Sequence, residues 1–349
     1  MFFVFLLASM LFLGCGSSES KMDEVFDLVA EQDVIEGDFF DIYDALETPD
    51  VQDADLEEAE EEEVSNPPLL YAKKAMESSD LVGGDNAYGR VGESYVLGNS
   101  KARFLIQDKG VAIHLSLFGG NLIDMDAVRE DGSKNDQFRE MFPVVGFRTM
   151  KTESVEVLKD GSDGKEAIVR ASGMDDNTGI IPTLDSLAVP LNIKIITDYI
   201  LEPDKPYLKV RTTVENKNDF PLENMVAGDF ISFGGAQHLL TRESGFGPEG
   251  GEYEFIVSYG RGASYGYAMS AGKVNVPLIE ASGAIAINTF SLTAQADGSA
   301  YFDRYFVVGN GDVASAIDII REIRGESFHT VSGIILSEKQ GKPLSGAKK

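Results

Sequence analysis

From about Leu69 to Phe328, apolar and polar residues alternate in short segments that Gly, Asn, Asp and Pro separate. The alternation is clearest from Tyr207 to Asn216, where Leu, Val or Thr at every second position alternates with Lys, Arg, Thr or Glu. A period of two predicts a β-strand with one buried face and one face in water. Strands are expected at 94–98, 102–107, 110–118, 142–149, 153–159, 165–172, 192–202, 207–216, 225–233, 252–259, 264–269, 284–291 and 300–308. The pattern therefore predicts an all-β fold, a large antiparallel β-sandwich.

Turn residues join several of these segments. The stretch from Pro203 to Pro206 lies between two long β segments, and Pro and Asp are turn-forming residues, so residues 192–216 are expected to form one hairpin. Residues 160–166 are expected to form a second hairpin turn. One helix is predicted, from Val313 to Arg324, with Asp312 as its N-cap and Gly325 just beyond its end.

The first fifteen residues form an apolar run that ends in Gly14 and Cys15. The run is short for a membrane span, and residues 12–15 resemble the lipobox of bacterial lipoproteins. Phe12 stands where Leu is usual, and no Lys or Arg precedes the run, so a plain secretory signal or an uncleaved anchor stays open. Cys15 is the single cysteine of the chain. We expect lipidation at Cys15, with export to the bacterial outer membrane or the cell surface.

Residues 16–68 have the composition of an acidic, disordered linker. Between Glu19 and Glu63 there are twenty acidic residues and one basic residue, Lys21, so this segment carries −19 of the formal net charge of −28. Such a charge repels nucleic acid and anionic lipid alike, and neither is expected as a direct partner. Attachment to a membrane is expected to come from the acyl chains on Cys15. The domain that follows is expected to span residues 69–328.

Five short blocks of this domain resemble the N-terminal sandwich of exported PHP-type metallohydrolases of the carbaryl-hydrolase kind. The blocks are residues 118–124, 160–170, 197–201, 227–230 and 304–309. The resemblance implies a galactose-mutarotase-like supersandwich that precedes a regulatory-like domain and a metal-binding hydrolase domain. The hydrolase domain needs many His and Asp ligands, whereas this chain has three His. The catalytic domain is therefore expected to be absent from the chain.

Residues 329–349 resemble the opening hairpin of carboxypeptidase regulatory-like domains, which are small sandwiches of the transthyretin kind. The resemblance lies in Val331-Ser332-Gly333 and in the stretch from Gly341 to Ala347. In that family another strand follows, whereas here the chain ends at Lys349. We expect this segment to be the truncated start of such a domain.

Few residues are candidates for chemistry. His114 is expected to be a half-exposed strand residue, and no two His have metal-ligand spacing, so no metal or cofactor is predicted. Sugar epimerisation needs a His that acts with a carboxylate, and His238 with Glu243 or Glu252 is the candidate pair. Ligand-binding candidates are His238, Tyr253, Tyr259, Tyr265 and Tyr267, because aromatic rings pack on sugar rings and nearby Gly260, Gly262 and Gly266 would leave the tyrosines accessible. The absence of Trp and the abundance of Tyr in ordinary strands argue against sugar binding.

Three functional hypotheses follow. The first is a lipid-anchored binding or non-catalytic accessory module, with carbohydrate as one possible ligand. The second is the N-terminal part of a metal-dependent hydrolase whose catalytic domain lies downstream. The third is a mutarotase-like enzyme. Of these, the sequence favours a binding module over an enzyme.

Overall fold

A computed structural model describes residues 70–179, 189–280 and 282–327. These residues belong to one compact unit that spans Val64–Lys349. The predicted signal at 1–15 with Cys15, the linker at 16–68 and the terminal hairpin at 329–349 lie outside the described residues.

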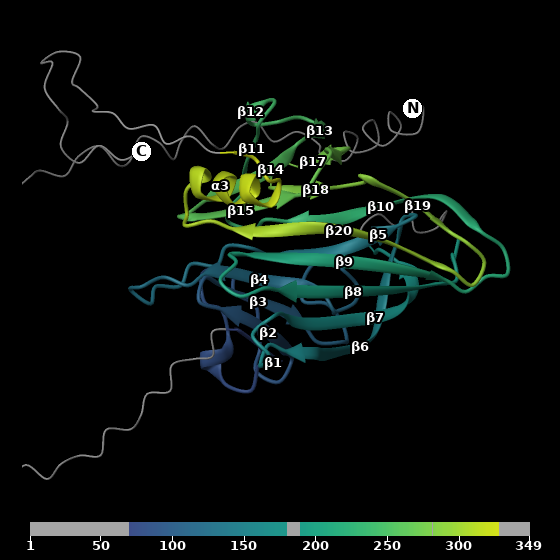
Figure 1. Cartoon of the computed structure of the whole chain (residues 1–349), viewed down its shortest axis with the longest axis horizontal. Coiled ribbons are helices and arrows are strands. Elements are labelled where there is room, and N and C mark those ends of the chain that lie inside the picture. Colours follow the sequence, from purple (N-terminus) through teal and green to yellow (C-terminus); the bar gives the residue numbers. More distant parts are fainter. Residues whose placement is uncertain (1–69, 180–188, 281, 328–349) are drawn as a thin grey trace, which may run out of the picture. The chain divides into compact units, whose positions relative to one another are not determined.

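The described residues form an antiparallel β structure with a short 3-10 helix, η1 (Ser78–Asp80), and one α-helix, α3 (Val313–Ile323) (Figure 1). The first ten strands are β1 (Leu70–Lys74), β2 (Ser94–Asn99), β3 (Ala102–Gln107), β4 (Leu122–Ala127), β5 (Glu140–Val145), β6 (Arg148–Asp160), β7 (Ala167–Asn177), β8 (Ile193–Leu201), β9 (Tyr207–Asn216) and β10 (Leu222–Ser232). The others are β11 (His238–Thr241), β12 (Gly245–Phe246), β13 (Gly251–Tyr253), β14 (Phe255–Gly260), β15 (Ala263–Ala268), β16 (Val274–Val276), β17 (Leu278–Ile279), β18 (Ala284–Ala286), β19 (Phe290–Ala294) and β20 (Ser299–Val308).

Strands that follow one another along the chain pair from β1 to β9. The ladder continues from β9 through β20, β15 and β14 to β11 and β12, while β10 pairs with β5, β18 and β19. Only one residue pair joins β4 to β5, and only one joins β5 to β6. The pairing between neighbouring strands is therefore weakest at these two places, and there the sheet turns back on itself. As a result, β1 and β2 lie against β6, β7 and β8. The inward side chains of both layers form one apolar core, as expected of a sandwich.

The structure confirms the predicted all-β antiparallel fold with one late helix. Strands β3 and β9 have the predicted bounds, and β8 pairs with β9 as the predicted hairpin, Ile193 facing Asn216. The turn between β6 and β7 also forms as predicted, because Asp160 accepts a hydrogen bond from the backbone of Ser162. Alternation therefore identified most of the long strands.

Four predicted strands differ from the structure. Residues 284–291 divide into β18 and β19, both of which pair with β10. Residues 142–149 do not form one strand, because the chain reverses at Gly146 and Phe147, whose positive φ angles are those of a tight hairpin turn. Residues 110–118 form a loop with one isolated bridge, between Val111 and Phe118. Residues 252–259 divide into β13, which pairs with β16 in a separate two-stranded sheet, and β14.

Helix α3 begins as its sequence predicts. The carboxylate of Asp312 accepts a hydrogen bond from the backbone of Ser315 at 2.8 Å, and Gly325 has a φ of 67° just beyond the helix. Ala316 and Ile320 are buried against β14, β15 and β20. Figure 1 shows α3 beside the sheet near β14 and β15. A side chain at Gly266 of β15 would lie 2.8 Å from Ile320, so this glycine admits the helix. The helix therefore covers one face of the sheet.

The centre of the sandwich contains a fully buried ion pair. Arg304 of β20 donates two hydrogen bonds to Asp229 of β10, at 2.9 and 2.6 Å, and one to Thr212 of β9, at 2.7 Å. Tyr267 of β15 donates a further hydrogen bond to Asp229 at 2.7 Å. Both charged side chains have no exposed surface. The pair and its two hydrogen-bonded neighbours therefore connect four strands, β9, β10, β15 and β20.

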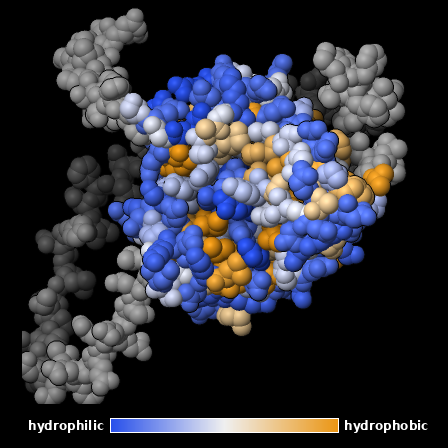
Figure 2. Space-filling view, turned by 45° about the vertical axis from the view of Figure 1, so that its right-hand side comes forward, coloured by the Kyte–Doolittle hydropathy of each residue, from blue (hydrophilic) through white to orange (hydrophobic). Residues whose placement is uncertain are grey.

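Figure 2 shows polar side chains over much of one face, with apolar side chains gathered in patches between them. Phe246, with 67% of its surface exposed, is among the most exposed large apolar residues. Among the residues that the structure describes, no helix has the length and apolar character that crossing a membrane requires.

Candidate functional site

Three of the four candidate tyrosines are buried, which corrects the expectation that the neighbouring glycines leave them accessible, and Tyr265 and Tyr267 are the most completely buried. Their exposed fractions are 1% and 0%. Each hydroxyl donates to a buried carboxylate, Tyr265 to Asp136 and Tyr267 to Asp229. Because these partners stabilise the polar ends of the rings, both tyrosines can be core residues. Tyr253 is buried as well.

The other two candidates lie together on the surface. His238 of β11 faces Tyr259 of β14 in the strand register, and their ring centroids are 5.5 Å apart. The ring of Phe246 lies 5.6 Å from that of Tyr259 and comes from β12, the strand that pairs with the other edge of β11. His238 and Phe246 are exposed and Tyr259 is half-buried. We call these three rings the aromatic strip.

The predicted acid–base pair does not form. Glu243 accepts a hydrogen bond from the backbone of Glu254 and lies 3.7 Å from the Lys273 ammonium group. Glu252 lies on β13, in the separate two-stranded sheet. Within the described residues, neither carboxylate makes a hydrogen bond or ion pair with His238. Sugar epimerisation through this pair therefore has no support in the geometry.

A second group of polar residues comes from three loops, and the sequence pattern gave no sign that these loops lie together. The backbone of Tyr88 and Gly89 donates two hydrogen bonds to buried Asp124 of β4, at 2.8 and 2.7 Å. Buried Asp136, in the segment before β5, accepts hydrogen bonds from Met125, Phe138 and Tyr265. These two carboxylates fix the loop around Tyr88 and the segment from Asp136 to Arg139.

Asp124 and Asp136 form a buried acid pair. Burial raises the pKa of Asp124 to about 6, against hydrogen bonds from Tyr88 and Gly89 that lower it. Burial and the charge of Asp124 raise the pKa of Asp136 well above its usual range. One buried oxygen of Asp136 has no hydrogen-bond partner. The pair therefore holds a proton more strongly than two carboxyl groups in water do.

A third carboxylate, Glu140 of β5, fixes the loop that contains His114. It accepts hydrogen bonds from the backbone of Leu115 and Ser116, at 2.7 and 3.1 Å, and from the amide of Asn121 at 2.9 Å. The loop backbone therefore bonds to a side chain and not to a neighbouring strand. This is the physical reason why His114 is not the strand residue that alternation predicted.

His114 and Arg139 lie on these fixed loops. The His114 ring packs edge-on against Tyr88, with centroids 3.9 Å apart, and its buried Nε2 has no hydrogen-bond partner. Burial and the charge of Arg139 lower the pKa of His114 to about 4, so the ring is neutral at physiological pH. The buried Nε of Arg139 also lacks a partner. We call Tyr88, His114 and Arg139 the His–Arg cluster.

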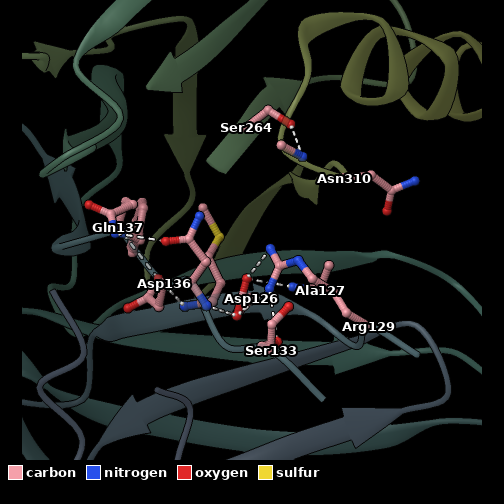
Figure 3. Close-up of polar contacts among 12 residues, drawn as sticks. Asp126, Ala127, Arg129, Ser133, Asp136, Gln137, Ser264 and Asn310 are labelled. Atoms are coloured by element: carbon pink, nitrogen blue, oxygen red, sulfur yellow. Dashed lines mark hydrogen bonds and ion pairs between the residues drawn. The ribbon is translucent and has the colours of Figure 1, made fainter. Parts of the chain in front are cut away.

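A polar network lies beside this cluster. Asn86 donates to the backbone and side-chain oxygens of Gln137, and Gln137 donates to Asn135 at 3.1 Å. A neighbouring hollow of about 110 Å³ is lined in part by Asp126, Arg129 and Ser133 (Figure 3). The Arg129 guanidinium in this hollow is already paired with Asp126 through two hydrogen bonds of 2.9 Å. The charge of Arg129 is therefore already neutralised, whereas the buried nitrogens of His114 and Arg139 in the His–Arg cluster have no partner.

In residues 70–179, 189–280 and 282–327, no group of three or more His, Cys, Asp or Glu side chains is arranged to hold a metal ion.

Comparisons with known proteins give no family assignment. No protein-family model and no curated protein matches the sequence. A solved structure from Klebsiella pneumoniae that is described as an aldose 1-epimerase is similar to the chain at 10% identity and a TM-score of 0.41, over 80% of this chain and 96% of that one. A galactose mutarotase-like protein from Lactobacillus casei has 13% identity and a TM-score of 0.39, over 62% of this chain and 99% of that one.

A TPR-domain protein from Parabacteroides distasonis has 9% identity and a TM-score of 0.40, over 71% of this chain. This chain spans about half of that protein, 51% of its length. At these identities and TM-scores, the similarities assign no residue, ligand or reaction to this chain.

Proposed function

We propose that this chain is an exported, lipid-anchored protein whose β-sandwich is a non-catalytic binding module for carbohydrate. The observation that carries the proposal is the aromatic strip, in which the ring of Tyr259 contacts the rings of both His238 and Phe246 on the surface. The apolar face of a sugar ring packs on such rings, while its hydroxyls bind nearby donors and acceptors. Among the described residues, the hydroxyl of Tyr259 and the ring nitrogens of His238 have no hydrogen-bond partner. These groups remain available to sugar hydroxyls.

We expect Tyr259→Ala to weaken carbohydrate binding by about tenfold, because the substitution removes the ring that contacts both other rings of the strip. Binding is first found on a carbohydrate array with the intact protein and then measured by calorimetry. Tyr301→Ala is the matched control, since Tyr301 is an exposed tyrosine on β20 outside the strip, and it should bind normally. Equal affinity of both variants, with circular dichroism like that of the unsubstituted protein, would disprove the role of the strip.

The membrane anchor is proposed at Cys15. The support comes from the sequence alone, namely the apolar run, residues 12–15 and the acidic segment that follows. In bacteria that are fed labelled palmitate, the protein should incorporate label, and Cys15→Ser should abolish it because no other cysteine is present. Ser17→Ala, two residues away, should leave labelling intact. Full labelling of the Cys15→Ser variant would refute the anchor.

The same sandwich is also compatible with a role as the N-terminal module of a PHP-type metallohydrolase. This alternative is supported by the five blocks within residues 118–309 and by the regulatory-like hairpin pattern at 329–349. In such a protein, the module would present bound ligand to a hydrolase domain.

A further inference from the structure

Arg139 differs from the buried arginines of the described structure. Arg148 and Arg304 each donate hydrogen bonds to an aspartate. The half-buried Arg139 side chain has neither an ion pair nor a hydrogen bond among the described residues, and its Nε is shielded from water. In a chain with a net charge of −28, an arginine of this kind without a carboxylate is unexpected. A buried polar group without a partner requires an explanation, and a bound ligand is one.

The nearby carboxylates are already engaged. Glu140 accepts three hydrogen bonds that hold Leu115, Ser116 and Asn121. Asp124 holds the loop of Tyr88, and Asp136 holds the segment that leads to Arg139. Each of these acids fixes a loop and none pairs with Arg139. The cation therefore remains unneutralised on a rigid support.

His114 adds a neutral hydrogen-bonding group. Its buried Nε2 has no partner, and the ring packs against that of Tyr88 with the two centroids 3.9 Å apart. Its low pKa keeps the ring uncharged near pH 7. One guanidinium and one neutral imidazole supply a single positive charge, which matches a singly charged anion better than a phosphate dianion. The planar fork of arginine also matches the planar oxygens of a carboxylate.

We infer that Tyr88, His114 and Arg139 form a binding site for the carboxylate group of a small ligand. Arg139 binds the two oxygens of the carboxylate, His114 donates a further hydrogen bond, and Tyr88 holds the imidazole ring in place. This site rests on residues other than the aromatic strip and stands independently of the proposed carbohydrate function.

The test titrates the intact protein with sodium D-glucuronate, sodium acetate, inorganic phosphate and D-glucose by calorimetry. We expect glucuronate and acetate to bind through the shared carboxylate, with glucuronate tighter if the ligand is an acidic sugar. Arg139→Gln should weaken glucuronate binding at least tenfold, and Arg139→Lys should weaken it less, because it keeps the charge but loses the fork. Arg90→Gln is the control, since Arg90 is an exposed arginine close to Tyr88 in sequence, and it should bind normally.

The absence of carboxylate binding at millimolar concentrations would overturn the inference, as would equal binding by Arg139→Gln. Phosphate binding as tight as that of glucuronate would overturn the preference for a single charge. If Arg139→Gln fails to fold, glucuronate binding is measured with Arg139→Lys and His114→Asn instead. Unchanged glucuronate affinity in both of these variants would overturn the proposed site. Tyr259→Ala should leave acetate binding intact, because acetate has a carboxylate but no sugar ring to pack on the aromatic strip, and this separates failure of the carboxylate site from failure of the strip.

Discussion

Replacing Asp229 with Ala is expected to lower the free energy of unfolding by about 3–5 kcal/mol. The substitution leaves the Arg304 guanidinium buried without its charge partner, because Asp229 accepts two hydrogen bonds from it. It also removes the acceptor of the Tyr267 hydroxyl. Removing one member of a fully buried ion pair costs far more than the pair itself contributes, since the remaining charge stays out of water.

Urea unfolding followed by circular dichroism measures this effect, because the chain has no Trp to report by fluorescence. Asp303→Ala is the matched control, since Asp303 also accepts two hydrogen bonds from an arginine, Arg211, but is 26% exposed. Its expected cost is at most about 1 kcal/mol. A cost for Asp229→Ala as small as that of Asp303→Ala would contradict the structural role of the buried pair.

The second large effect concerns pH. Asp136 has a raised pKa, so the folded protein binds this proton more strongly than the unfolded chain does. The stability that this proton contributes is full at low pH and is lost as pH rises through the folded pKa. Measured between pH 6.5 and 8, the free energy of unfolding should fall as pH rises, at no more than about 1.4 kcal/mol per pH unit for one proton. Asp124, with a pKa of about 6, has largely titrated below this window.

Asp136→Asn should abolish this fall. The amide keeps an oxygen to accept the hydrogen bonds from Met125 and Phe138 and no longer titrates. Stability between pH 6.5 and 8 should therefore be constant in the variant. Asp131→Asn makes the same charge change on an exposed turn and should retain the slope of the unsubstituted protein. A slope in Asp136→Asn equal to that in Asp131→Asn would rule out a titrating buried acid pair.

Local sequence was sufficient where neighbours along the chain determine the structure. Alternation predicted β9 because its side chains face one core, and Asp312 predicted the start of α3 because an N-cap bonds only three residues ahead. Local sequence failed at His114, because the group that holds its loop is Glu140, which lies 25 residues beyond Leu115. It failed at Tyr265 for the same reason, since Asp136 is 129 residues away.

The candidate site was predictable only in part. His238 and Tyr259 were identified as aromatic residues and do lie together, whereas the exposed ring of Phe246 completes the strip from another strand. The unpaired state of Arg139 could not be seen in the sequence, because it depends on which carboxylates are already engaged. Some residues of the five blocks that resemble PHP-type metallohydrolases have a structural role here. Asp124, Asp198, Asp229 and Arg304 make buried or half-buried hydrogen bonds that stabilise the fold.

Carbohydrate binding at the aromatic strip is the central claim, and a crystal structure of the protein with a glycan that it retains on an array tests it most directly. The account predicts a sugar ring packed on Tyr259 and Phe246, with a hydroxyl within hydrogen-bond distance of His238. A glycan bound elsewhere on the sandwich, or an array that retains no glycan at all, would contradict it.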